Sequence, residues 1–176
     1  MHILVTNDDG VYAPGIFALQ SALRRIPGDE ITIMAPAENQ SAVGHRKTLY
    51  DPLRIKQARL AEGVEAFACS GSPADSIALA LLGYVRQPVD IVVSGVNQGA
   101  NLAQDITYSG TVTAAMEAVL FGVLAIAVSL DSYTEPEFGQ AADFAASLVP
   151  VVLEKGLPDR TLLNVNVPFG PVRGVR

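Results

Sequence analysis

Short apolar segments alternate along the chain with longer segments in which apolar residues recur at helical spacing. The helical spacing predicts helices over residues 14–26, 73–83, 111–121 and 137–154, the last kinked or interrupted at Pro150. Residues 36–47 and 95–110 are polar and irregular, and they are expected to be loops. The apolar segments predict strands at residues 2–6, 30–35, 53–55, 64–69, 90–94, 124–130 and 162–167.

This alternation predicts an α/β fold, with a mostly parallel sheet between two layers of helices in a three-layer α/β/α, Rossmann-like arrangement. Several of the expected strands contain a continuous apolar run, such as residues 3–5 (ILV), 91–93 (IVV) and 124–128 (LAIAV), which indicates a sheet buried on both faces. Ligands in such folds bind at the carboxyl ends of the strands. The loops that follow the strands are therefore where candidate functional residues are sought.

The composition narrows the possible functions. Of the 176 residues, 49% are apolar and 17% charged, which excludes intrinsic disorder. The formal net charge is -6 and no run of Lys and Arg occurs, so a nucleic-acid polymer is not an expected partner. The single cysteine, Cys69, predicts a cytoplasmic location, and neither a signal peptide nor a membrane span is expected.

Two adjacent carboxylates, Asp8 and Asp9, directly follow the first predicted strand. Carboxylates at such a position repel each other unless a cation or a proton intervenes. Oxygen ligands suit Mg²⁺, Mn²⁺ or Ca²⁺, and the sequence has no Cys/His cluster typical of structural zinc. The pair therefore favours a divalent-metal site, although Asp residues beside Gly10 are also typical of a solvated turn.

Two other segments place amide and hydroxyl side chains at the ends of expected elements. Asn97 and Asn101 lie in a glycine-containing loop after the fifth strand, which suits either ligand binding or a tight connection. Residues 109–113 (Ser-Gly-Thr-Val-Thr) lead into a helix, where N–H groups and hydroxyls attract anions but also form ordinary caps. No Lys follows Gly110, so this is not a Walker motif.

The irregular segment 40–45 (Gln-Ser-Ala-Val-Gly-His) contains further candidates. Ser41 offers a neutral oxygen ligand, and its neighbours lack the glycine pattern of a nucleophilic serine. His45, next to Gly44, could contact substrate or donate a proton, although a single loop histidine is more often incidental.

Together these segments resemble the SurE family of stationary-phase survival proteins, which act as 5'/3'-nucleotidases. The resemblance follows the family order along essentially the whole chain. It is carried by residues 3–15 (ILVTNDDGVYAPG), 35–36 (AP), 40–41 (QS), 71–75 (GSPAD), 93–101 (VSGVNQGAN), 108–115 (YSGTVTAA) and 164–168 (NVNVP).

The resemblance implies a set of site residues. The family holds one divalent ion, Mg²⁺ or Mn²⁺, on positions that fall here on Asp8, Asp9, Ser41 and Asn97, and the two aspartates are the expected catalytic residues. The family's phosphate contacts fall on Asn101, Ser109, Gly110 and Thr111. We add Gly44 and His45 as expected substrate contacts.

The implied activity is metal-dependent hydrolysis of nucleoside 5'- and 3'-monophosphates, and some members also cleave short polyphosphate. Attack is expected from water, with Asp8 or Asp9 as proton acceptor, or through a phosphorylated Asp8. Two non-catalytic alternatives are a Mg-dependent nucleotide-binding module and a receiver-like module. A receiver domain needs an Asp at the end of a later strand and a Lys beyond it, but this chain has Ser94 and Ser129 at the corresponding strand ends, with no Lys near. A nucleotide-binding module would be expected to have a glycine-rich fingerprint after the first strand, where this chain has Asp-Asp-Gly.

Family members usually continue well beyond the length of this sequence. The resemblance therefore implies that residues 1–176 form a single SurE-like catalytic domain without the family's C-terminal oligomerisation arm and tail. In full-length form, a homodimer or homotetramer is expected.

Overall fold

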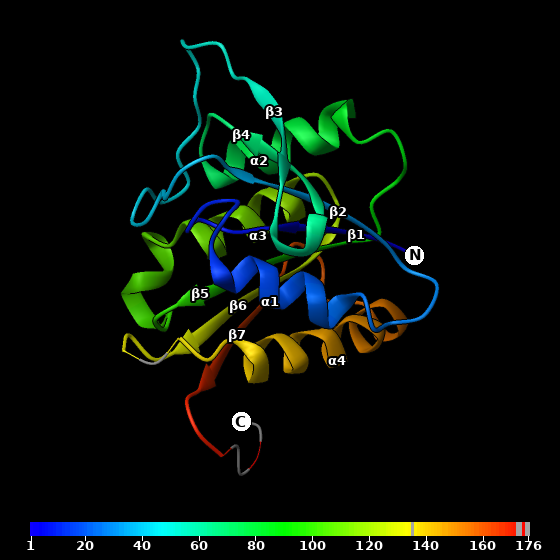
Figure 1. The fold of residues 1–176 in the computed structure, drawn as a ribbon, viewed down its shortest axis with the longest axis vertical. Helices are drawn as coiled ribbons and strands as arrows, with labels where there is room; N and C mark the ends of the chain where they lie inside the picture. Colours follow the sequence, from blue (N-terminus) through cyan, green and yellow to red (C-terminus); the bar gives the residue numbers. More distant parts are fainter. Residues whose placement is uncertain (135, 172–173, 175–176) are drawn as a thin grey trace.

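A seven-stranded sheet lies at the centre of the computed structural model, which describes residues 1–134, 136–171 and 174 (Figure 1). The sheet order is β3-β4-β2-β1-β5-β6-β7, and only the β3–β4 pair is antiparallel. The strands are β1 (His2–Thr6), β2 (Glu30–Pro36), β3 (Ile55–Arg59), β4 (Glu65–Cys69), β5 (Ile91–Gln98), β6 (Leu124–Asp131) and β7 (Leu163–Pro168).

Helices cover both faces of this sheet. Helices α1 and α4 pack on one face and α2 and α3 on the other, which confirms the expected three-layer α/β/α arrangement (Figure 1). The α-helices are α1 (Pro14–Leu23), α2 (Pro73–Leu79), α3 (Gly110–Leu120) and α4 (Gly139–Lys155). Shorter helical segments are η1 (Ala61–Gly63), η2 (Ala80–Tyr84) and η3 (Ala103–Thr107).

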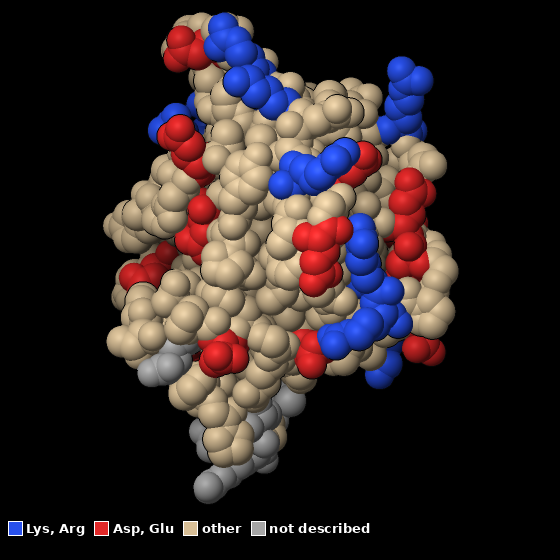
Figure 2. Space-filling model, in the orientation of Figure 1, with Lys and Arg blue, Asp and Glu red and all other residues tan. Residues whose placement is uncertain are grey.

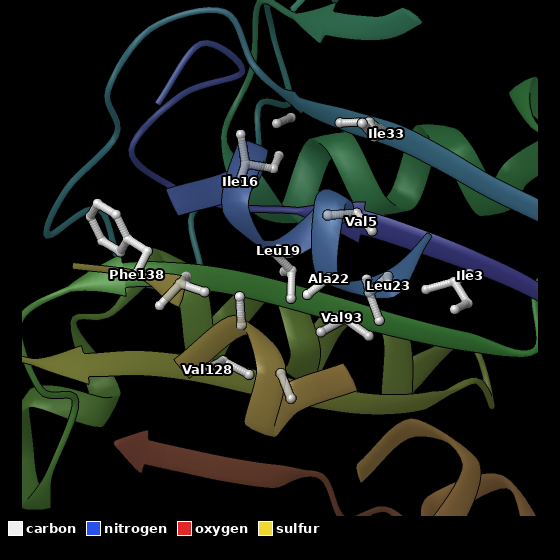
Figure 3. Packing of buried hydrophobic residues seen from close by; sticks show 14 of the residues in the cluster. Ile3, Val5, Ile16, Leu19, Ala22, Leu23, Ile33, Val93, Val128 and Phe138 are labelled. Carbon is white, nitrogen blue, oxygen red and sulfur yellow. The ribbon is translucent and has the colours of Figure 1, made fainter. Parts of the chain in front are cut away.

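The central strands have apolar side chains on both faces because each face carries its own core. Val5 packs with Leu19 of α1 on one side (Figure 3), whereas Leu4 packs with Val112 of α3 on the other. All four are fully buried. Burying one such side chain contributes about 1.5–3 kcal/mol, so the two cores fix the sheet and both helix layers together.

Strand β1 lies in the middle of the sheet, between β2 and β5. From β1 the chain continues to β2 on one side of it and later returns to form β5 on its other side, so the sheet has a switch point beside β1. Ligands bind at such points in open α/β sheets. Thr6, the last residue of β1, pairs with Ser94, and β5 continues beyond this pair to Gln98. The residues that follow β1 therefore emerge at the centre of the sheet's carboxyl edge.

Two sequence-based boundaries along the sheet are wrong. The strand expected at residues 53–55 is in fact β3, Ile55–Arg59, an exposed edge strand whose charged residues hide the apolar signal. The loop expected from residue 95 starts later, because β5 continues to Gln98 through a change of register after Ser94.

The helices also differ from expectation at their ends. Helix α1 ends at Leu23, and tighter turns carry the chain on to Ile26. Helix α4 runs uninterrupted through Pro150. Ser72 caps α2, and its side chain and that of Asp75 exchange hydrogen bonds with each other's backbone N–H.

Basic side chains do not gather into a patch on the face shown in Figure 2, where Lys and Arg alternate with Asp and Glu. This agrees with a chain that has 12 basic and 18 acidic residues. Within the described ranges, no helix is both long enough and apolar enough to cross a bilayer.

Candidate metal and phosphate site

Asp8 is a buried carboxylate close to the start of α3. The residue is 3% exposed, and its carboxylate accepts hydrogen bonds from the hydroxyl and the N–H of Thr111. Burial, reinforced by the neighbouring Asp9, raises the pKa of Asp8 from its ordinary value of 3.8 to about 6 despite those bonds. In the described part of the chain, no Lys, Arg or His forms an ion pair with either aspartate.

Asp9 is half-buried and joins β1 to two other segments. Burial raises the pKa of Asp9, against hydrogen bonds donated by the Gln98 N–H and by Asn39, whose Nδ2 is 3.3 Å from Asp9 Oδ1. Asn39 Oδ1 in turn accepts from the N–H of Ser41 at 2.8 Å. The predicted ligand Ser41 is thus linked to Asp9 through Asn39, and its own side chain is exposed.

A β-bulge shapes the end of β5 beside Asp9. The register with β6 shifts between Ser94 and Asn97, and a Cβ on Gly95 would collide with the carbonyl oxygen of Val128. Asn97 Nδ2 donates to the carbonyl oxygen of Gly99 at 2.8 Å. This bond orients the amide so that Oδ1 is the atom of Asn97 able to ligate a metal ion.

Helix α3 begins directly against Asp8. Ser109 is its N-cap, and Ser109 Oγ accepts from the Val112 N–H at 3.1 Å. A Cβ on Gly110 would lie 2.6 Å from Asp8 Cβ, so only glycine allows this approach. The Ser109 O–H and the Gly110 N–H remain donors for an anion, whereas Thr111 already donates to Asp8.

Asn101 is fixed at the same edge of the sheet by the last two strands. Its Nδ2 donates to Ser129 Oγ at 2.8 Å, and its backbone N–H donates to Asn166 Oδ1 at 2.8 Å. Asn164 Nδ2 donates to the Asn101 carbonyl oxygen at 2.9 Å. Asn101 is buried, and its Nδ2 keeps a second hydrogen for a ligand.

Residues 40–48 cross the starts of α2 and α3. The Gln40 N–H donates to the Asp8 carbonyl oxygen at 2.7 Å, and the Gly44 N–H donates to the Tyr108 carbonyl oxygen at 2.9 Å. Thr113 Oγ1 donates to the Gly44 carbonyl oxygen at 2.9 Å. Gly44 is thus a buried backbone contact next to Ser109, close to the other predicted phosphate contacts.

His45 is directed elsewhere. Its Nε2 lies 2.7 Å from Glu117 Oε2, and Lys47 Nζ lies 2.7 Å from Glu117 Oε1. Glu117 is about 10 Å along α3 from the helix start. His45 also lines a separate cleft with Met116 and Leu162 that shares no lining residue with the cleft at Asp9. The structure therefore does not bring the His45 side chain together with the other predicted site residues.

The donor set fits a divalent cation. The two aspartates are adjacent, raised in pKa by burial, and free of basic partners among the described residues. Asn97 and Ser41 add neutral oxygens, as hard cations prefer. No cluster of three His, Cys, Asp or Glu side chains that could hold a metal occurs within the described ranges, so any such ion must rely on these mixed oxygens.

Sequence reasoning missed the residues that hold the site in place. Asn39 joins Asp9 to Ser41, and Asn164 and Asn166 hold Asn101. One signal was available for the last pair: in Asn164-Val-Asn166, residues two apart on a strand face the same side. Asn39 lies in an irregular segment whose pairing had no such pattern.

Comparison with known proteins decides the family. A family model described as survival protein SurE matches residues 3–176. This chain belongs to the SurE family.

Individual relatives agree with this assignment. The SurE-family chain is 52% identical to the 5'-nucleotidase SurE of Syntrophotalea carbinolica, over 100% of its own length and 69% of the relative's. It is 52% identical to the 5'-nucleotidase SurE of Geobacter sulfurreducens, over 97% of its own length and 63% of the relative's. A crystal structure of SurE protein from Aquifex aeolicus matches with a TM-score of 0.84 and 38% identity, over 96% of this chain and 66% of the Aquifex chain. The chain thus spans about two thirds of the length of these relatives.

Proposed function

We propose that this SurE-family protein is a divalent-metal-dependent phosphomonoesterase that hydrolyses nucleoside 5'- and 3'-monophosphates to nucleoside and phosphate. Its relatives at about half identity are named 5'-nucleotidases. Short polyphosphate is a further substrate that the same phosphate contacts could accept.

One observation carries this proposal: a buried, unpaired carboxylate lies in contact with a helix start that offers anion donors. Asp8 repels a phosphate, whereas the Gly110 N–H and the Ser109 O–H attract one. The two preferences are compatible when a cation lies between Asp8 and the phosphate. We therefore assign Mg²⁺ or Mn²⁺ to Asp8, Asp9, Ser41 and Asn97, the oxygen donors at this edge.

Each residue then has a role in the reaction. Ser109, Gly110 and the Nδ2 of Asn101 donate hydrogen bonds to phosphate oxygens and hold the group next to Asp8. Asp8 or Asp9 accepts a proton from the attacking water as the new P–O bond forms. The P–O bond to the nucleoside breaks, and the leaving oxygen takes a proton from solvent. When bound, the divalent ion supplies positive charge that offsets the charge on phosphate and activates water.

The test is phosphate release from AMP and GMP with Mg²⁺ or Mn²⁺, against the same protein in EDTA. Asp9→Asn should abolish most of the metal-dependent activity, and Asp51→Asn, at an exposed position outside the site, should retain it. Turnover in EDTA equal to turnover with metal would contradict the proposal. Trapping of phosphate on Asp8 would instead replace direct attack by water with a covalent route.

A further inference from the structure

A cleft of about 550 Å³ opens beside Asp9, on the opposite side of the sheet edge from the start of α3. It is bordered by the turn after β1, by the segment after β2 and by the end of β5. Its Phe138 lies at the end of the core toward which the strands point (Figure 3). The residues that give the cleft its chemical character are Asp9, Tyr12, Glu38, Asn39, Gln98 and Phe138.

The charge of this cleft favours an uncharged occupant over a phosphate. Besides Asp9, which is assigned to the metal ion, the carboxylate of Glu38 lines the cleft, and no Lys or Arg is among its described lining residues. A phosphate would meet like charge here, whereas the donors of Ser109 and Gly110 lie with Asp8 on the other side. A ligand that spans both regions must therefore place its anionic end at α3 and an uncharged end in the cleft.

Tyr12 presents an aromatic face to that uncharged end. Its side chain is 66% exposed, although it belongs to a firmly anchored turn. The Val11 N–H donates to the Pro36 carbonyl oxygen at 2.8 Å, and the Ala13 N–H donates to the Gly10 carbonyl oxygen at 3.0 Å. These bonds fix the backbone that carries Tyr12, so when its ring stacks on a planar partner only the side chain remains to be ordered.

The polar groups of the cleft are suited to hydrogen-bond donors. Across the described residues, the Glu38 carboxylate has neither a hydrogen bond nor an ion pair, so both of its oxygens are available acceptors. Nucleobases and ribose present N–H and O–H donors beside a flat aromatic face. This combination matches an aromatic ring next to a free carboxylate.

We propose that this cleft is the nucleoside subsite, in which the base stacks on Tyr12 while Glu38 accepts hydrogen bonds from base or ribose. The proposal rests on the proposed function, because it places the phosphate at α3. It makes Tyr12 a residue that determines preference for nucleotides over phosphomonoesters that lack a base.

The test compares kcat/KM for AMP with kcat/KM for ribose 5-phosphate, which keeps the sugar and phosphate but lacks the base. Loss of base stacking typically changes binding by about five- to 150-fold. Tyr12→Leu should lower the ratio of AMP to ribose 5-phosphate about tenfold. Tyr12→Phe keeps the ring and should restore most of the ratio, and Tyr50→Leu, at an exposed tyrosine outside the cleft, should leave it unchanged.

A second variant tests the acceptor independently. Glu38→Gln should weaken competitive inhibition by the product nucleoside adenosine by about three- to tenfold. If Tyr12→Leu lowers kcat/KM equally for AMP and ribose 5-phosphate, or lowers it for neither, the subsite assignment is wrong while the phosphatase function stands. If the parent protein releases no phosphate from either substrate, the proposed function fails. Titration of adenosine into the parent protein and into Tyr12→Leu then tests the nucleoside subsite without any need for turnover. Equal affinities of the two proteins for adenosine would overturn the subsite assignment.

Discussion

Replacing Asp8 by asparagine should stabilise the metal-free protein, although it removes a residue assigned to catalysis. Burial raises the pKa of Asp8 from 3.8 to about 6. The folded state therefore binds more protons than the unfolded chain between these values, and stability falls as the pH rises through this window. At about 1.4 kcal/mol per pH unit, the ionised carboxylate costs about 3 kcal/mol at pH 8.

An asparagine side chain at this position would keep the shape and an acceptor for Thr111 without the charge. We expect Asp8→Asn to raise the free energy of unfolding in EDTA by about 2–3 kcal/mol at pH 8, and by little at pH 4. Urea unfolding at several pH values measures this difference, with Asp51→Asn as the control at an exposed aspartate.

The same pair of proteins tests the metal assignment. Saturating Mg²⁺ or Mn²⁺ should stabilise the parent at pH 8, by about 2.7 kcal/mol at a hundred times the Kd, and should do little for Asp8→Asn. If the variant is less stable than the parent at pH 8 in EDTA, the argument that Asp8 is held at an electrostatic cost is wrong.

Three other changes test neighbouring contacts. Gly110→Ala would place a Cβ 2.6 Å from Asp8 Cβ, and the resulting shift of about 1 Å should lower phosphatase turnover about 100-fold with an unchanged circular dichroism spectrum. Gly15→Ala would drive a Cβ into the Val96 carbonyl oxygen, and urea unfolding should show a loss of about 1–3 kcal/mol. Although burial opposes them, hydrogen bonds from Thr48 and Ser72 lower the pKa of Asp75. The stability they add is therefore present above Asp75's ordinary pKa and lost as the pH falls below about 4, and unfolding of Asp75→Asn should lack this acid dependence.

The fold was predictable because its strongest signals are local and repeated. Strands β1, β4 and β6 are apolar on successive positions, which indicates burial on both faces, and the structure confirms the parallel three-layer arrangement. Strand β3 was misplaced because an edge strand needs no such pattern. The end of β5 was missed because a bulge lets Gly95 and polar residues continue a strand, against their usual preference for loops.

The candidate site was predictable to a different degree. Asp8 and Asp9 stand out because adjacent carboxylates after a buried strand repel each other unless a cation or a proton lies between them. The role of Asn101 depends on Asn164 and Asn166, and such long-range pairing cannot be read from spacing along one strand. The prediction of His45 as a substrate contact stays untested, and the structure gives its side chain a partner, Glu117, that no local pattern indicated.

The central place of β1 has a consequence for how the protein folds as it is synthesised. β1 is made before the other described strands, yet it lies between β2 and β5, and the His2 N–H bonds to Asp90 across 88 residues of chain. At about 5–20 residues per second, β5 emerges about 4–18 s after β1, so the N-terminal strand waits with one edge unpaired. The surroundings of the aspartate pair are therefore completed late, although the pair itself is synthesised before the other residues of the site. Chains ended at residue 90 should be cleaved near β1 by a protease, and equal protection of such chains and the 176-residue chain would contradict this order.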